Sequence, residues 1–223
     1  MAGNSAIGER RFADRESAGR ALADRLVALD LKDPVVLALP RGGVPVGAEI
    51  AKRLKAPLDL ILVRKIGHPR QPELAIGAVV DGSEPELVKN EEALWGLPDA
   101  ERVLADGEAR ELKEIERRRN LYFGGRKRAP ITGRSAIVVD DGIATGATMR
   151  AALVATRRLK PAKLVLAVPV APAETIAALR NEVDEVVCLA IPEPFYAIGL
   201  HYRDFHQLGD KEVISLLNLA QPS

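Results

Sequence analysis

The sequence contains one cysteine and three histidines in 223 residues, and each shortage excludes a class of site. A lone cysteine cannot close an internal disulfide. Cys188 stands within the apolar run 186–189, which predicts a buried small hydrophobic side chain and not a nucleophile. Three histidines without clustered cysteines argue against a structural zinc site. The spacing of His201, Asp204 and His206 matches no metal site either.

The sequence also lacks a strong net charge and long apolar runs. A formal net charge of +1 creates no field that would hold a long polyanion, so nucleic acid is not expected as a partner. No apolar run approaches the roughly 20 residues of a membrane span. Residues 1–4 show no basic segment leading into an apolar core, so we expect no signal peptide and a cytoplasmic protein. The content of 47% apolar and 28% charged residues is typical of a soluble globular domain.

Apolar runs alternate with helical periodicity along much of the chain. Strands are predicted at 35–39, 58–63, 136–139, 163–168 and 186–190. Helices are predicted at 14–29, 44–54, 145–159, 173–179 and 210–219. This alternation implies an α/β fold with a mainly parallel sheet and helices on both faces. Because ligands gather beyond the carboxyl ends of parallel strands, the segments that follow these strands are expected at one edge of the sheet.

The stretch 64–134 interrupts the alternation. It contains a short predicted strand at 75–80 and a long, exposed helix at 98–120, in which nine of the twelve residues 108–119 are charged. Such a run predicts a solvated helix face. The alternative is that arginines 117–119 face a ligand phosphate or a partner subunit. We interpret 66–130 as a lid or insertion within one domain spanning 1–223. The sequence does not decide between a monomer and a homo-oligomer.

The most informative segment is 136–148, with the sequence AIVVDDGIATGAT. An apolar strand leads into Asp140 and Asp141, and a turn of small residues containing Thr145 and Thr148 then opens a helix. Backbone N–H groups at a helix N-terminus attract a phosphate, whereas carboxylates suit hydroxyl groups or a metal ion. An ordinary Asp-Asp-Gly turn followed by a threonine cap is the alternative. The combination of strand, acid pair, turn and helix favours a sugar phosphate.

This segment resembles the phosphoribosyl pyrophosphate (PRPP) binding motif of the type I phosphoribosyltransferases. Five positions match the family pattern: Asp140, Asp141, Thr145, Gly146 and Thr148. Gly142 and Ala147 depart from it, because the family usually has a branched apolar residue at the first position and frequently glycine at the second. The order of predicted elements from 35 to 190 is similar to the core of that family. The resemblance therefore implies a type I phosphoribosyltransferase-like fold with a small hood, which we place at 191–209, and a lid insertion.

The resemblance also implies roles for the residues of the motif. The carboxylates of Asp140 and Asp141 would hold the ribose 2- and 3-hydroxyls of PRPP, and they would also hold Mg2+, directly or through water. The backbone of the turn would hold the 5-phosphate, through Ala144, Thr145, Gly146, Ala147 and Thr148. Ala144 stands where hypoxanthine-guanine enzymes carry an aspartate that faces the purine, which argues against a 6-oxopurine substrate.

Two other segments fall where the family binds pyrophosphate. The turn that contains Arg41, Gly42 and Gly43 follows the first core strand, where the family has its pyrophosphate loop. Glycines there allow unusual backbone geometry, and Arg41 supplies a fixed cation. Arg64 and Lys65 end the second predicted strand, near the cations that help to neutralise pyrophosphate in the family. A tight turn with a surface arginine and a solvated strand end are the respective alternatives.

The predicted hood is rich in proline and aromatic residues. Phe195 lies where the family covers the acceptor base, and its ring would stack on a flat acceptor. The alternative is that the aromatic residues of this segment anchor the tail to the core.

The resemblance implies a Mg2+-dependent phosphoribosyltransferase that displaces pyrophosphate from PRPP with a nitrogenous base or another small amine, or runs the reverse reaction. The residues expected to carry the chemistry are Asp140, Asp141, Arg41 and Lys65. A non-catalytic PRPP- or nucleotide-binding regulator is the alternative, because one fold can serve both uses. Hydrolysis of a sugar phosphate in the same pocket is a third hypothesis.

Overall fold

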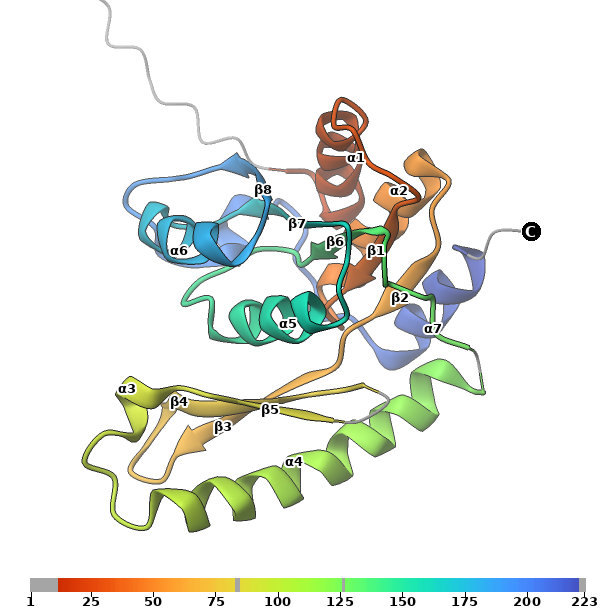
Figure 1. Ribbon diagram of the computed structural model, residues 1–223. Helices are drawn as coiled ribbons and strands as arrows, with labels where there is room; N and C mark the ends of the chain where they lie inside the picture. The colour runs from red at the N-terminus through yellow and green to blue at the C-terminus, as the bar shows by residue number, and fades with distance from the viewer. Residues whose placement is uncertain (1–11, 83–84, 126, 221–223) are drawn as a thin grey trace, which may run out of the picture.

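The computed structural model describes residues 12–82, 85–125 and 127–220, so residues 1–4 lie outside the described part. Five strands form a parallel sheet in the order β2-β1-β6-β7-β8. Their bounds are β1 Val35–Ala38, β2 Leu58–Leu60, β6 Ser135–Val139, β7 Lys163–Val170 and β8 Glu185–Ala190. Helices pack on both faces (Figure 1), which confirms the predicted mainly parallel α/β fold.

Alternating residues of each strand face different helices. Val36 and Ile137 belong to the cluster that includes α1 (Arg15–Leu26) and α2 (Gly43–Leu54). Val35 and Val138 belong to the cluster on the opposite face, which includes α5 and α6. The remaining helices of the core are α5 Ala147–Arg158, α6 Ala173–Leu179, α7 Asp210–Leu219 and the short 3-10 turns η1 Arg180–Glu182 and η2 Ile198–His201. Because both faces are covered, the strands read as continuous apolar runs.

A second, antiparallel sheet follows β2, in the order β3-β4-β5. Its strands are β3 Val63–His68, β4 Gln71–Val80 and β5 Glu86–Lys89, followed by α3 Glu91–Leu94 and α4 Ala100–Phe123. One face of this sheet packs on α4 and the other on α5 (Figure 1). The single strand predicted at 58–63 is therefore wrong, because the chain leaves the parallel sheet after Leu60. Ile61 and Leu62 stay buried between the two sheets. The sequence is therefore continuously apolar at the point where the parallel strand ends.

The long helix α4 was predicted, but it is not simply a solvated rod. Leu104 and Ile115 are buried against β3 and β4, and Gly107 allows Ile66 to pack closely on the helix backbone. The arginines 117–119 all have acidic partners in the same chain. Two of them bind Glu114, and the third binds the buried Asp81 at the end of β4. The acidic partners come from α4 itself and from the second sheet.

Among the helices of the described ranges, none is both long enough and apolar enough to cross a membrane.

Candidate functional site

The predicted pyrophosphate loop and the predicted PRPP loop lie side by side. They follow β1 and β6, which are neighbours in the parallel sheet, and the backbone N–H of Leu39 donates to the carbonyl of Val139 at 2.9 Å. The carboxyl ends of two adjacent strands therefore bring residues 40–43 against residues 140–146, as the edge rule for parallel sheets predicts.

The loop after β6 ends in a free helix terminus. Helix α5 begins at Ala147, two residues later than predicted, and Gly146 is its N-cap with a φ of +79° and no side-chain cap. The first N–H groups of an uncapped helix need an outside acceptor, and the helix dipole favours an anion there. Thr175 on α6 donates its hydroxyl to the carbonyl of Ala144 at 2.6 Å, which anchors the loop. Thr145 is exposed and Thr148 is half-buried, so both hydroxyls remain near the surface.

Gly142 departs from the family pattern for a packing reason. A β-carbon at this position would lie 2.6 Å from Cγ2 of Ile198 and 3.0 Å from Cγ1 of Val170. Ile198 comes from the predicted hood and fills the space that a branched side chain at 142 would take. The glycine thus lets the segment after β8 pack onto the loop.

The two carboxylates of the motif have different surroundings. Asp140 is half-buried, and its Oδ1 accepts from the backbone N–H of Asp141 at 2.8 Å. Burial and the charge of Asp141 raise the pKa of Asp140 well above its ordinary value. Asp141 is 8% exposed. Burial raises its pKa as well, although the neighbouring guanidinium of Arg15 opposes that rise.

Arg15 is a site residue that sequence reasoning missed. Its Nε donates to Oδ2 of Asp141 at 2.8 Å, and both side chains are buried. Arg15 is the first residue of α1, and Asp14 caps that helix. A cation in the first turn of a helix is disfavoured by the helix dipole, so its position was a signal that a specific partner holds it.

The glycines of the 40–43 loop are required by close approach and not by backbone conformation. Gly42 has an ordinary φ of −58°, but a β-carbon on it would lie 2.1 Å from Oδ2 of Asp141. A β-carbon on Gly43 would lie 2.7 Å from the carbonyl oxygen of Val139. The Pro40–Arg41 peptide bond is cis. Arg41 is half-exposed, and its nearest acidic partner among the described residues is Asp210 at the start of α7, at 3.9 Å.

The structure separates Arg64 from Lys65. Both lie inside β3 and not at the end of a parallel strand, which corrects their predicted position. The Nε of Arg64 donates to Oε2 of Glu111 on α4 at 2.9 Å, on the face of the sheet away from α5. Lys65 is exposed and pairs with Ala78, whose side chain belongs to the core cluster of α5. Lys65 therefore shares the face that looks toward the PRPP loop, whereas Arg64 does not.

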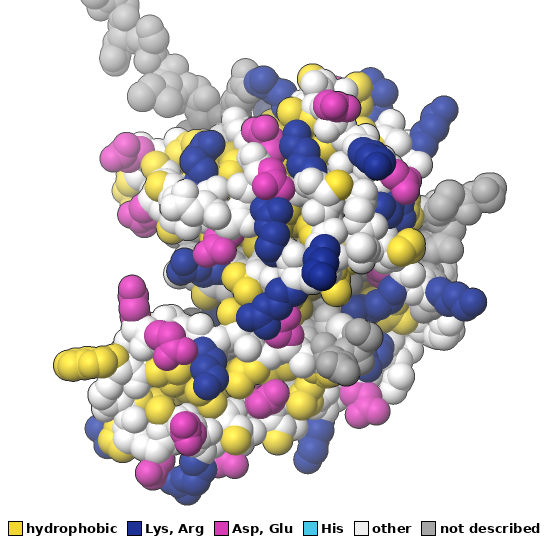
Figure 2. Space-filling view, viewed as in Figure 1, with side chains coloured by type: hydrophobic (Ala, Val, Ile, Leu, Met, Phe, Trp, Pro, Cys, Tyr) yellow, Lys and Arg dark blue, Asp and Glu magenta, His cyan; other side chains and the backbone are white. Residues whose placement is uncertain are grey.

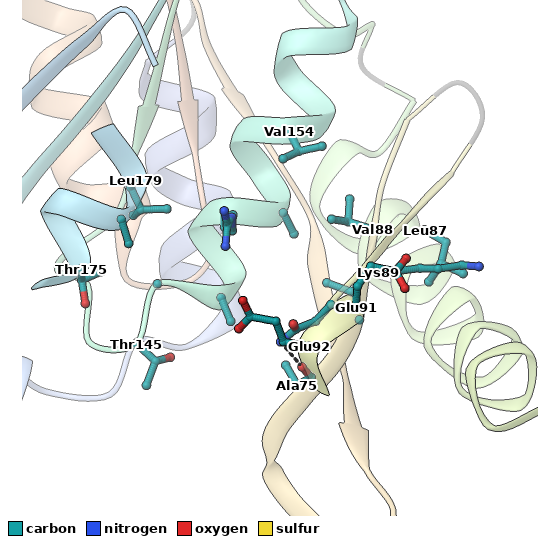
Figure 3. A pocket seen from close by; sticks show the side chains of 18 of the residues that line it. Ala75, Leu87, Val88, Lys89, Glu91, Glu92, Thr145, Val154, Thr175 and Leu179 are labelled. Atoms are coloured by element: carbon teal, nitrogen blue, oxygen red, sulfur yellow. Dashed lines mark hydrogen bonds between the residues drawn. The ribbon is translucent and has the colours of Figure 1, made fainter. Parts of the chain in front are cut away.

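A cavity begins at Thr145–Ala147 and runs between α5 and the second sheet. It has a volume of about 710 Å³, and Val154 on α5, Val88 on β5 and Glu92 on α3 are among its lining residues (Figure 3). The space-filling view shows the corresponding hollow between the core and the second sheet (Figure 2). The predicted phosphate loop thus opens into a space large enough for a small molecule.

A smaller cavity of about 510 Å³ shares Thr145 and Thr175 with the first. Phe195 and Tyr196 line it together with Pro172 and Thr175. The ring of Phe195 stacks on that of His201, with centroids 5.8 Å apart, so Phe195 is held within its own segment while it offers an aromatic wall to the cavity. Stacking of Phe195 on a flat acceptor stays a prediction.

No group of three or more His, Cys, Asp or Glu side chains that could hold a metal ion occurs among the described residues. Asp140 and Asp141 nevertheless provide two carboxylates at the site. Mg2+ in proteins is held by one or two carboxylates together with substrate phosphates and water, so this pair fits an ion that arrives with a phosphorylated substrate.

Comparison with known proteins identifies the family of the chain. The family model for the phosphoribosyl transferase domain matches residues 13–202. The chain belongs to this family. The match includes both loops of the site, the second sheet and Arg15.

Relatives with similar sequences are known from Mycobacterium tuberculosis. A protein provisionally named a phosphoribosyl transferase, found in strains H37Rv and CDC 1551, is 48% identical over 209 residues, or 94% of this chain. The chain spans only 47% of the length of that relative.

Solved structures agree with this fold. The crystal structure of the protein TT1426 from Thermus thermophilus is 44% identical with a TM-score of 0.82, over 93% of this chain and 97% of that chain. A Neisseria gonorrhoeae protein with bound ppGpp has a TM-score of 0.50 at 15% identity, over 93% of both chains, which shows a shared fold alone.

Proposed function

We propose that the chain transfers the ribose 5-phosphate group of PRPP to a small nitrogenous acceptor and releases pyrophosphate, or catalyses the reverse reaction. The observation that carries this proposal is the juxtaposition of the loop 40–43 and the loop 140–146 at the carboxyl ends of β1 and β6. The first loop presents a cation, and the second presents two carboxylates and a free helix N-terminus. A pyrophosphate, a ribose and a 5-phosphate require these three features in this order.

The reaction asks the protein for positioning and charge neutralisation more than for covalent chemistry. The uncapped start of α5 holds the 5-phosphate, and the acid pair meets the ribose hydroxyls. Arg41 and Lys65 stabilise the negative charge that develops on the departing pyrophosphate. Asp140 and Asp141 would hold Mg2+, which would supply further positive charge for the pyrophosphate.

The acceptor binds in the cavity beside Phe195. Ala144 and Thr145, at the start of the loop assigned to the 5-phosphate, line this cavity, and its aromatic wall suits a flat ring. Ala144 offers no carboxylate to such a ring. We expect the second sheet and α4 to act as a lid that excludes water, the competing nucleophile.

The test is pyrophosphate release from PRPP and Mg2+ across a panel of nucleobases and small amines. We expect release with at least one acceptor, and loss of most of it in Asp141→Asn, while the variant stays folded by circular dichroism. Arg20→Gln is a matched control, because Arg20 lies on the exposed side of α1 and pairs weakly with Glu49 at 3.7 Å.

Three other outcomes would contradict parts of the proposal. Tight PRPP binding without pyrophosphate release would favour a regulator. Release with water as the sole acceptor would favour a hydrolase. Wild-type turnover by Asp141→Asn would refute the role of that carboxylate.

A further inference from the structure

The guanidinium of Arg15 is held on three sides. Its Nε donates to Asp141, and its Nη1 donates to the backbone carbonyl of His206 at 2.9 Å. Its central carbon lies 3.9 Å from the centre of the Phe205 ring, a cation–π contact. The side chain is 8% exposed. A long flexible side chain is thus fixed in one orientation by the segment that follows β8.

The side chain of Asp141 is fixed in the same way. Oδ2 accepts from Arg15, and the carboxylate packs directly on the α-carbon of Gly42. The backbone carbonyl of Asp141 accepts from the hydroxyl of Tyr202 at 2.5 Å. Burial and the charge of Asp141 raise the pKa of Tyr202, so this hydroxyl stays protonated and remains a donor. Asp141 is therefore a link between α1, the 40–43 loop and the segment after β8.

We propose that Arg15 and Asp141 form a positioning pair that holds the 40–43 loop in the conformation that binds pyrophosphate. This inference rests on the proposed function and refines it, because it divides the acid pair. Asp141 supports the loop that carries Arg41, and Asp140, whose Oδ1 accepts from the backbone N–H of Asp141, meets the ribose. Arg15 is a positioning residue and not a catalytic one, since it acts through Asp141.

The backbone N–H of Gly43 donates to the carbonyl of Leu39 at 3.0 Å and holds the base of the loop, but the side chains of the loop add little to its packing. Gly42 and Gly43 have no side chains to pack, and Arg41 is half-exposed. The carboxylate of Asp141 lies against Gly42 and supplies this packing contact. If Arg15 is removed, the carboxylate of Asp141 loses its anchor and the loop loses its support. A displacement of about 1 Å at a binding group can weaken binding or catalysis about a hundredfold.

The test measures the two halves of the substrate separately by calorimetry. Sodium pyrophosphate reports on the 40–43 loop, and ribose 5-phosphate reports on α5 and the ribose site, both at one fixed Mg2+ concentration. In Arg15→Gln we expect pyrophosphate affinity to fall about tenfold to a hundredfold, and ribose 5-phosphate affinity to stay within about twofold. Asp140→Asn should show the reverse pattern. Arg20→Gln should bind both ligands as the wild type does.

Two further variants separate positioning from folding. Arg15→Gln combined with Asp141→Asn removes both buried charges and leaves no unpaired carboxylate, so it keeps the test valid if the single variant fails to fold. If the pair acts as a unit, the double variant loses no more pyrophosphate affinity than either single variant. Arg15→Lys keeps the positive charge but lacks the planar guanidinium. We expect this variant to retain part of the pyrophosphate affinity that Arg15→Gln loses.

The outcomes distinguish this inference from the proposed function. Equal loss of both ligands in Arg15→Gln and in the double variant would overturn the positioning role, because it would mean a general loss of structure. Unchanged pyrophosphate affinity in Arg15→Gln would overturn it as well. Failure of the wild type to bind ribose 5-phosphate, pyrophosphate or PRPP would instead overturn the proposed function, and this inference with it.

Discussion

The carboxylate of Asp141 lies so close to Gly42 that a β-carbon on Gly42 would come within 2.1 Å of Oδ2. These residues are far apart in the sequence and belong to different loops. Their contact packs the two loops of the site directly against each other, so a side chain at position 42 would displace Asp141.

The first prediction concerns this contact. Gly42→Ala should displace the carboxylate or the loop and lower the rate of pyrophosphate release about tenfold to a hundredfold. The fold should persist, since the new methyl group meets a side chain and not the core. Gly209→Ala is a matched control, because a β-carbon there meets nothing closer than 3.4 Å. Equal rates of pyrophosphate release for Gly42→Ala and the wild type would show that the contact between Gly42 and Asp141 does not affect function.

The second prediction concerns Gly142. Gly142→Ala should destabilise the protein by about 1–3 kcal/mol, because its β-carbon would lie 2.6 Å from Cγ2 of Ile198. Urea unfolding followed by circular dichroism measures the effect. Truncation of the neighbour in Ile198→Ala should make the alanine at 142 tolerable, so the double variant should cost less than the sum of the single variants. Simple additivity would indicate that the two positions do not compete for space.

The third prediction separates two neighbouring cations. Lys65→Ala should lower kcat for pyrophosphate release with little change in the melting temperature, because Lys65 is exposed on the face of β3 that looks toward the site. Arg64→Ala should chiefly lower stability, by about 1–3 kcal/mol, because it removes a hydrogen bond to the buried carboxylate of Glu111.

Parallel thermal melts and rate measurements check both variants. A larger loss of kcat in Arg64→Ala than in Lys65→Ala, at equal stability, would reverse the assignment of the two residues.

The fourth prediction concerns pH. Burial and a hydrogen bond to Asp210 raise the pKa of Tyr122 from 10.0 to about 12. Because the pKa of Tyr122 is higher in the folded state than in the unfolded state, its protonation stabilises the fold. This contribution is fully present at pH values below the unfolded-state pKa and is lost as the pH rises through about 12. Tyr122→Phe should therefore be less stable than the wild type at neutral pH, and the difference should shrink between pH 10 and about pH 12.

Tyrosinate absorbance checks the assignment directly. The wild type should show one ionisation near pH 12 that is missing in Tyr122→Phe. Loss of an ionisation near pH 10 in its place would mean that Tyr122 has an ordinary environment.

Much of the core could be predicted because its signals are local. The strand β6 and the helix α6 reflect apolar runs and periodicities that do not depend on distant residues. The break between β2 and β3 could not be predicted, since the apolar residues Leu60, Ile61, Leu62 and Val63 continue across it. Only the presence of a second sheet decides where the first one ends.

The candidate site divides in the same way. The motif at Asp140 and Asp141 and the loop at Arg41 stand out because each follows a strand directly. Arg15 carried only one signal, its place in the first turn of a helix, and Tyr202 carried none, since each meets Asp141 only after the chain has folded.

The sequence by itself determined the class of the protein, because an apolar strand, an acid pair and a glycine-containing turn at a helix start form a continuous local pattern. Tertiary structure alone decided how the two carboxylates differ. Arg15 comes from an element more than a hundred residues earlier in the chain. Its contact with Asp141 depends on which helices cover which face of the sheet, and the burial and charge that distinguish Asp141 from Asp140 are properties of that arrangement.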